Sequence, residues 1–151
     1  MHTILFPGSF NPFTVGHQSL VARVLPLFDR VVIAVGVNAH KDSGDETAQR
    51  VEAIRSLYAS EPKVSVIAYS GLTVDVCEAE GARWMLRGVR STVDFEYERN
   101  LADINRRISG IETLLLFTLP EYASVSSSMV RELRSYGRDV SEFLPQPATE
   151  K

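Results

Sequence analysis

Five short apolar runs recur along the chain, and a more polar segment separates each run from the next. The runs are TILF (residues 3–6), VVIAVGV (31–37), VSVIAY (64–69), WML (84–86) and TLLLF (113–117). Strands that are apolar on both faces need cover on both sides, which is typical of parallel sheets flanked by helices. The alternation of strands with helices predicts right-handed crossovers. The sequence therefore predicts an α/β fold: a doubly wound parallel sheet of five strands with helices on both faces.

Three of the connecting segments carry apolar residues at helical spacing and are expected to form amphipathic helices. They contain Leu20, Val24 and Leu27, then Val51, Ile54 and Tyr58, and finally Tyr97, Leu101, Ile104 and Ile108. A further helix is expected after the serines at 126–128, with Gly137 as its stop. No repeat or linker divides the sequence, so we expect one domain over residues 1–151, with a loose tail from about residue 146.

Charge and cysteine content narrow the class of protein. The net charge is −3, whereas a general nucleic-acid or membrane-surface binder gains its affinity from many basic contacts. A single cysteine, Cys77, allows no internal disulfide, which favours a reducing compartment. No apolar run has the length of a membrane span or the flanks of a secretory signal. We therefore expect a cytoplasmic protein with neither a nucleic-acid nor a membrane partner.

The loop FPGSFNPFTVGH (6–17) follows the first predicted strand. In an open parallel sheet, ligands bind beyond the carboxyl ends of the strands, near the point where strand order reverses. Gly8 and Ser9 can bring backbone N–H groups and a hydroxyl close to an anion. Gly16 and His17 would begin the next helix, whose N-terminus favours phosphate. A plain strand-to-helix connection with a histidine at the helix start explains the loop equally well.

Four further polar stretches follow the later strands. They are NAHKDSGDETAQR (38–50) with Lys41, GLTVD (71–75) with Leu72 and Thr73, RGVRSTVDFEYE (87–98) with Arg87, Arg90, Asp94 and Glu98, and YASVSSSMVRE (122–132) with the serines at 126–128. Each has an ordinary explanation: a solvated lysine, a helix cap, local ion pairs, or serines that cap a helix. Together they place cations and hydroxyls at the sheet edge where this fold binds ligands.

Three motifs carry a resemblance to a known family. GSFNPFTVGH (8–17) resembles the G-[ST]-F-[DN]-P-x-T-x-G-H opening of nucleotidyltransferases with the [HT]-x-G-H signature. RGVRSTVDFEYE and SSSMVRE resemble the phosphopantetheine adenylyltransferases of that superfamily, and the match runs from residue 3 to about residue 145. The resemblance implies a Rossmann-like fold and reversible transfer of AMP from ATP to 4′-phosphopantetheine, giving dephospho-coenzyme A and pyrophosphate. It also implies Mg²⁺ as cofactor, coenzyme A as a feedback ligand, and a homohexamer.

The resemblance also assigns roles to individual residues, with no metal ligand among them. The catalytic residues would be His17, Lys41 and Arg90, and those that bind phosphopantetheine would be Ser9, Lys41, Thr73 and Arg87. ATP would contact Ser9, Phe10, His17, Gly88, Val89, Arg90, Glu98, Tyr122, Ala123, Ser124, Val125, Ser126, Ser127 and Ser128. In this scheme His17 donates a hydrogen bond to the α-phosphate as charge develops during transfer.

The residue types suit direct in-line attack without a covalent intermediate. A phosphomonoester is mostly ionised at neutral pH and needs no protein base, while cations and helix N–H groups offset phosphate repulsion. Two alternatives remain open: a sibling transferase, such as a cytidylyltransferase, and a nucleotide-binding regulatory module without turnover. RGVR followed by DFEYE counts against the first alternative, and His17 together with Lys41 counts against the second.

Overall fold

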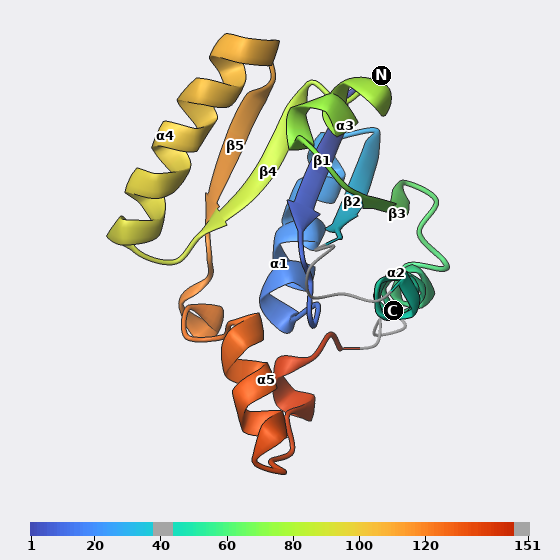
Figure 1. Cartoon of the computed structure of the whole chain (residues 1–151), viewed down its shortest axis with the longest axis vertical. Helices are drawn as coiled ribbons and strands as arrows, with labels where there is room; N and C mark the ends of the chain where they lie inside the picture. Colours follow the sequence, from blue (N-terminus) through green and yellow to red (C-terminus); the bar gives the residue numbers. More distant parts are fainter. Residues whose placement is uncertain (38–43, 147–151) are drawn as a thin grey trace.

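The computed structural model describes residues 1–37 and 44–146. The described chain forms one parallel sheet in the order β3-β2-β1-β4-β5, which confirms the predicted doubly wound, Rossmann-like fold (Figure 1). The strands are β1 (Thr3–Gly8), β2 (Arg30–Gly36), β3 (Val64–Tyr69), β4 (Trp84–Val89) and β5 (Glu112–Phe117). All five predicted runs are strands, and β4 continues beyond its apolar run to Val89.

Within the described residues, five α-helices connect or follow the strands. They are α1 (Val15–Val24), α2 (Gly44–Leu57), α3 (Thr73–Ala79), α4 (Thr92–Ser109) and α5 (Ser127–Ser135). Short 3₁₀ turns lie at Leu25–Leu27 (η1), Pro120–Tyr122 (η2) and Ser141–Phe143 (η3). Helix α4 begins where the Ser91 hydroxyl accepts the N–H of Asp94 and ends at Gly110, whose φ of 79° suits glycine. The predicted stop at Gly137 also has positive φ, two residues beyond the end of α5.

The sheet buries a separate apolar cluster on each face. On one face, Val21 of α1 and Ile54 of α2 pack with strand residues such as Ile33. On the other face, Val74 and Cys77 of α3 pack with strand residues that include Leu5 and Met85. Helices therefore cover both faces, as the apolar strands require.

The neighbouring strands β1 and β4 separate at their carboxyl ends. β1 pairs with β2 along its whole length, from Thr3 to Gly8. Its pairing with β4 covers only Ile4 with Trp84 and Leu5 with Met85. Strand order reverses between β1 and β4, so the gap opens at the position where doubly wound folds bind ligands.

The apolar stripe of α4 is not the buried face that its periodicity predicts. Tyr97, Ile104 and Ile108 are 65%, 54% and 59% exposed, whereas Glu98 and Asn105 are buried. The physical reason is position: α4 runs along β5, the edge strand of the sheet, and no described segment lies beyond it (Figure 1). Leu27 is also exposed, because the chain leaves α1 for the η1 turn before reaching it.

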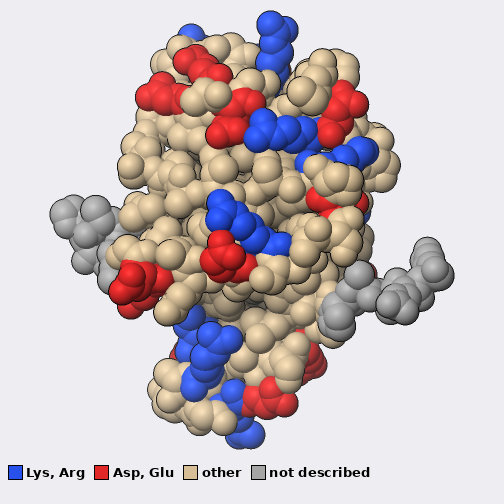
Figure 2. All heavy atoms as spheres, turned by 90° about the vertical axis from the view of Figure 1, so that its right-hand side faces the viewer, with Lys and Arg blue, Asp and Glu red and all other residues tan. Residues whose placement is uncertain are grey.

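The surface carries charges of both signs. Figure 2 shows acidic and basic side chains interspersed over the face that includes α2 and β3, with basic side chains grouped at the α5 end. Within residues 1–37 and 44–146, no helix has both the length and the apolar character of a membrane span.

Candidate active site

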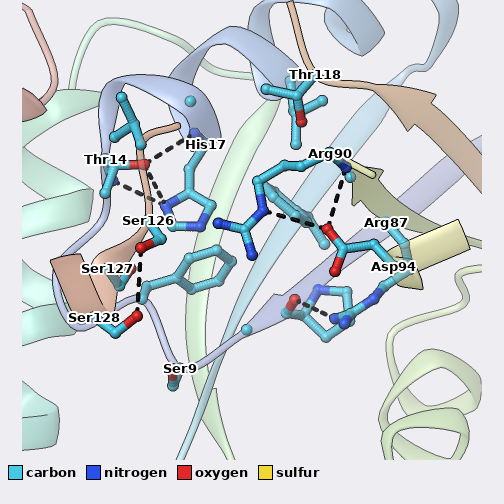
Figure 3. A pocket seen from close by; sticks show the side chains of 18 of the residues that line it. Ser9, Thr14, His17, Arg87, Arg90, Asp94, Thr118, Ser126, Ser127 and Ser128 are labelled. Atoms are coloured by element: carbon cyan, nitrogen blue, oxygen red, sulfur yellow. Dashed lines mark hydrogen bonds and ion pairs between the residues drawn. The ribbon is translucent and has the colours of Figure 1, made fainter. Parts of the chain in front are cut away.

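A cavity of about 500 Å³ lies where β1 and β4 separate. The N-termini of α1, α4 and α5 all contribute to its wall (Figure 3). Its lining comprises Phe6, Pro7, Gly8, Ser9, Phe10, Thr14, Gly16, His17, Leu20, Arg87, Gly88, Arg90, Asp94, Tyr97, Glu98, Thr118, Val125, Ser126, Ser127, Ser128 and Arg131. Three helix N-termini and several arginines around one cavity form a site suited to a polyanion.

Two glycines allow close packing at the floor of this cavity. A Cβ at Gly8 would lie 2.9 Å from ring carbons of Phe10, and one at Gly88 would lie 2.6 Å from Cδ1 of Leu20. Phe10 adopts a φ of 47°, an unusual value that turns its ring back over Gly8. The loop after β1 therefore packs on its own aromatic ring instead of extending into solvent.

His17 closes a capping box at the start of α1. Its backbone N–H donates to Thr14 Oγ1 at 3.4 Å, and the backbone N–H of Thr14 donates to His17 Nδ1 at 2.9 Å. The alternative reading of a helix-start histidine is therefore confirmed, yet the same ring also lines the cavity. Because Nδ1 accepts a hydrogen bond, the neutral ring carries its proton on Nε2.

The surroundings of His17 keep the imidazole neutral. Burial, and then the positive charges of Arg90 and Arg87, lower its pKa from 6.5 to about 4. Aromatic rings of Phe10 and Phe13 lie 5.0 and 5.3 Å from the imidazole, centroid to centroid. At neutral pH His17 is therefore an uncharged Nε2–H donor and not a cation.

The lowered pKa of His17 predicts a pH dependence of folding stability. Between pH 6.5 and pH 4 the unfolded chain binds a proton that folded His17 does not, so stability falls as pH decreases. At pH 4.5 the loss is about 2 to 3 kcal/mol relative to pH 7. Urea denaturation should show this excess loss in the native chain compared with His17→Gln. An equal loss in both chains would contradict the assignment.

Arg87, on β4, is held on two sides. Its Nε and Nη2 donate to the Glu98 carboxylate at 2.9 and 2.7 Å, and its Nη1 donates to the Pro7 carbonyl at 3.2 Å. Burial alone lowers the pKa of Arg87, but hydrogen bonding and the charge of Glu98 outweigh it and raise the pKa overall. The guanidinium therefore remains charged and spans the gap between β1 and β4.

Arg90 has a looser ion pair. Its Nε lies 3.4 Å from Asp94 Oδ2, and its side chain is 43% exposed compared with 29% for Arg87. The local ion pairs considered from the sequence are thus both present. In Figure 3 the guanidinium of Arg90 points toward the side of the cavity where His17 lies. Arg90 is therefore the more adaptable of the two cations.

The three serines begin α5. Ser126 is the N-cap and accepts the N–H of Met129 at 3.1 Å, which confirms the capping explanation. Ser127 donates to the Pro12 carbonyl at 2.7 Å and so joins α5 to the loop after β1. Ser128 lies 3.3 Å from Ser126, oxygen to oxygen. All three serines also line the cavity.

Several residues expected at the site are not among those that line this cavity. Thr73, at the start of α3, bonds to the Tyr69 hydroxyl at 3.1 Å, and β1 and β2 separate its strand from the gap. The side chain of Val89 is buried in the fold. Tyr122, Ala123 and Ser124, in and after η2, are also outside the lining. Lys41 lies outside the described residues.

Arg131 is a cavity residue that the sequence reasoning did not select. It lies in the second turn of α5, and its Nη1 donates to the Asn11 carbonyl at 2.5 Å. Tyr97 and Thr118 also line the cavity without having been singled out as site residues. The signal for Arg131 was its place in SSSMVRE, one helical turn after the serines.

The strand order, the gap at the reversal point and the three helix N-termini define a nucleotide-binding α/β protein. The cytidylyltransferase-like family matches residues 5–133. A solved structure described as a putative nicotinate-nucleotide adenylyltransferase from Vibrio parahaemolyticus superposes with a TM-score of 0.68. It covers 97% of this chain and 88% of its own, at 17% identity, and so shows the shared fold.

Three curated relatives, each named phosphopantetheine adenylyltransferase, are much closer in sequence. The protein of Phocaeicola vulgatus is 51% identical over 146 residues and that of Bacteroides thetaiotaomicron 46% over 146, each covering 97% of both chains. The protein of Porphyromonas gingivalis is 54% identical over 142 residues, covering 94% of this chain and 93% of its own. The chain belongs to the phosphopantetheine adenylyltransferases of the cytidylyltransferase-like family. That membership confirms the family, the enzyme class and the function predicted from the sequence.

Proposed function

We propose that the cavity at the β1–β4 gap binds ATP and the phosphate of 4′-phosphopantetheine together and joins them. A phosphate oxygen of phosphopantetheine attacks the α-phosphorus of ATP, and the bond from that phosphorus to the bridging oxygen of the β-phosphate breaks. The products are dephospho-coenzyme A and pyrophosphate. The observation that carries this proposal is the neutral Nε2–H donor of His17 beside three helix N-termini.

His17 is proposed to stabilise charge on the α-phosphate during transfer. Its Nε2–H has no hydrogen-bond partner among the described residues, and the capping box fixes the ring that carries it. A donor held in place before the reaction strengthens its bond as charge develops, without reorganisation. Ser9, Phe10, Gly88, Arg90 and the serines at 126–128 would complete the ATP side, with Val89 and residues 122–125 nearby.

The acceptor side is proposed to begin at Arg87, whose guanidinium already lies in the gap. Lys41 and Thr73 follow β2 and β3 in the chain, so phosphopantetheine would extend from the gap toward the ends of these strands. Ser9, between the two sides, is proposed to contact both phosphates. Lys41 and Arg87 then supply positive charge where two anionic substrates meet.

Mg²⁺ is proposed to accompany ATP and not to occupy a carboxylate site of the protein. Within residues 1–37 and 44–146, no three His, Cys, Asp or Glu side chains group as metal ligands. The cavity carboxylates Asp94 and Glu98 are both paired with arginines. The available hydroxyls suit an ion that keeps several waters and binds substrate phosphates. When bound, Mg²⁺ would neutralise part of the triphosphate charge.

The rate should rise with pH through the phosphate pKa of the substrate. The attacking phosphate of phosphopantetheine ionises near pH 6 without help from the protein. The pKa of His17 is lowered to about 4, so His17 causes no change in the pH–rate profile in that range. We expect kcat/KM for phosphopantetheine to follow the substrate's second ionisation, measured by steady-state assay between pH 5 and 8. If mutation of His17 shifts the pH at which kcat/KM rises, while the phosphate pKa of the substrate stays fixed, this expectation is wrong.

A coupled pyrophosphate-release assay tests the proposed function as a whole. Release should require ATP and phosphopantetheine together, and CTP should give little turnover. Turnover with CTP would favour the sibling cytidylyltransferase. Nucleotide binding without turnover under any combination would favour the regulatory module.

A homohexamer in the cytoplasm is proposed as the working form. The exposed apolar side chains on α4, with Phe117 at the end of β5, offer a surface that association would bury. Sedimentation equilibrium should give six times the monomer mass. A monomer at micromolar concentration would contradict the assembly but leave the reaction untouched.

A further inference from the structure

The ion pair between Arg87 and Glu98 is unusually complete for two side chains that line a cavity. Glu98 Oε1 accepts from Nη2 at 2.7 Å and Oε2 accepts from Nε at 2.9 Å, so the carboxylate faces one edge of the guanidinium. The Glu98 side chain is only 7% exposed. Paired donors of this kind fix both distance and orientation.

The Pro7 carbonyl holds the opposite side of the same guanidinium, at 3.2 Å from Nη1. Arg87 has five N–H groups, and these contacts use three of them. Two N–H groups therefore remain to meet a ligand. Glu98 supplies the negative charge that lets the guanidinium stay partly buried at the gap without a ligand.

We infer that Glu98 is a positioning residue for Arg87: it holds the guanidinium in the orientation that receives the acceptor phosphate. This inference rests on the proposed function and deepens it. The resemblance places Glu98 among the ATP contacts, but its carboxylate oxygens are directed to Arg87. Loss of the carboxylate therefore weakens use of phosphopantetheine, while ATP binding keeps its other contacts.

The test compares Glu98→Gln with the native enzyme, because glutamine keeps the shape but removes the charge. We expect kcat/KM for phosphopantetheine to fall about 10- to 100-fold, the scale for loss of an orienting partner. The ATP dissociation constant, measured by calorimetry, should change less than about threefold. The same substitution in an Arg87→Met background should have little further effect on kcat/KM, since the group that Glu98 orients is gone.

Glu80→Gln is the matched control. Glu80 pairs with Arg30 at 3.0 Å and is also partly buried, but the pair lies at the opposite end of the strands from the cavity. Loss of the Glu80 carboxylate measures the general effect of breaking an arginine–glutamate pair on stability. The kinetic constants for ATP and phosphopantetheine should stay unchanged. Thermal denaturation of all variants shows which ones are folded at the assay temperature.

Besides unchanged kinetics in Glu98→Gln, two results would overturn the inference. One is a loss of ATP affinity in Glu98→Gln as large as the loss in phosphopantetheine use, which would make Glu98 an ATP contact. The other is a loss of kcat/KM for phosphopantetheine from Glu98→Gln that is as large in the Arg87→Met background as in the native enzyme. If Glu98→Gln is unfolded, Glu98→Asp replaces it, and a shorter carboxylate should produce the same split between the two substrates. Absence of turnover in the native enzyme would contradict the proposed function, whereas native turnover with an unchanged Glu98→Gln contradicts only this inference.

Discussion

His17→Ala is expected to lower kcat about 10²- to 10³-fold while ATP and phosphopantetheine still bind with nearly normal affinity. The reason is that the Nε2–H of a neutral, preoriented imidazole gains strength only as charge develops on the α-phosphate. Single-turnover kinetics with saturating substrates measure this directly. The capping box also loses one hydrogen bond, so stability should fall by about 1 kcal/mol.

Gly16→Val is the paired control for this prediction. A Cβ at Gly16 would meet Thr14 Oγ1 at 3.5 Å and Tyr122 Cβ at 3.8 Å, which are ordinary contacts. The backbone therefore has room for a Cβ, and because Gly16 lines the cavity at the start of α1, we expect the added methyl groups of valine to hinder phosphate. ATP affinity should fall in Gly16→Val and persist in His17→Ala. If His17→Ala is folded and binds ATP but keeps a near-normal kcat, His17 does not stabilise the transition state.

Arg87→Met is expected to reduce kcat/KM for phosphopantetheine on the order of 10²- to 10³-fold, because it removes a charged contact from a desolvated site. It also leaves the Glu98 carboxylate buried without its partner. That uncompensated charge should lower the free energy of unfolding by about 3 kcal/mol or more, a loss that thermal denaturation measures. Arg87→Met combined with Glu98→Gln should recover part of the stability but none of the activity.

Arg87→Met removes both a contact with phosphopantetheine and the partner of Glu98, and Lys41→Ala is expected to remove only a contact of the first kind. It should weaken phosphopantetheine use in the same direction, without leaving the Glu98 carboxylate unpaired. Calorimetry with ATP should give nearly native affinity for both variants. If ATP affinity fell as much as phosphopantetheine affinity, the division of the cavity into an ATP side and an acceptor side would be wrong.

The sheet was predictable because its signals are local. Runs that are apolar on both faces predict strands, and apolar residues at helical spacing predict the helices between them. Neither signal depends on distant residues, and all five runs are strands in the structure. The location of the site followed from the same signals, since the loops after β1 and β4 must meet at one edge of a parallel sheet. Ser9, His17, Arg87 and Arg90 all line the cavity as the order of the motifs predicted.

Only the tertiary structure decided how these residues act. The separation of β1 from β4 after Leu5 depends on strand pairing, and no periodicity reveals where pairing ends. The contact of Arg87 with Pro7 joins residues 80 positions apart, and that with Glu98 joins a strand to the following helix. The exposed stripe of α4 has the same spacing as a buried one, because sequence periodicity shows that a face is apolar but not what lies against it. Which face meets solvent, and which carboxylate holds which cation, are set by distances across the fold.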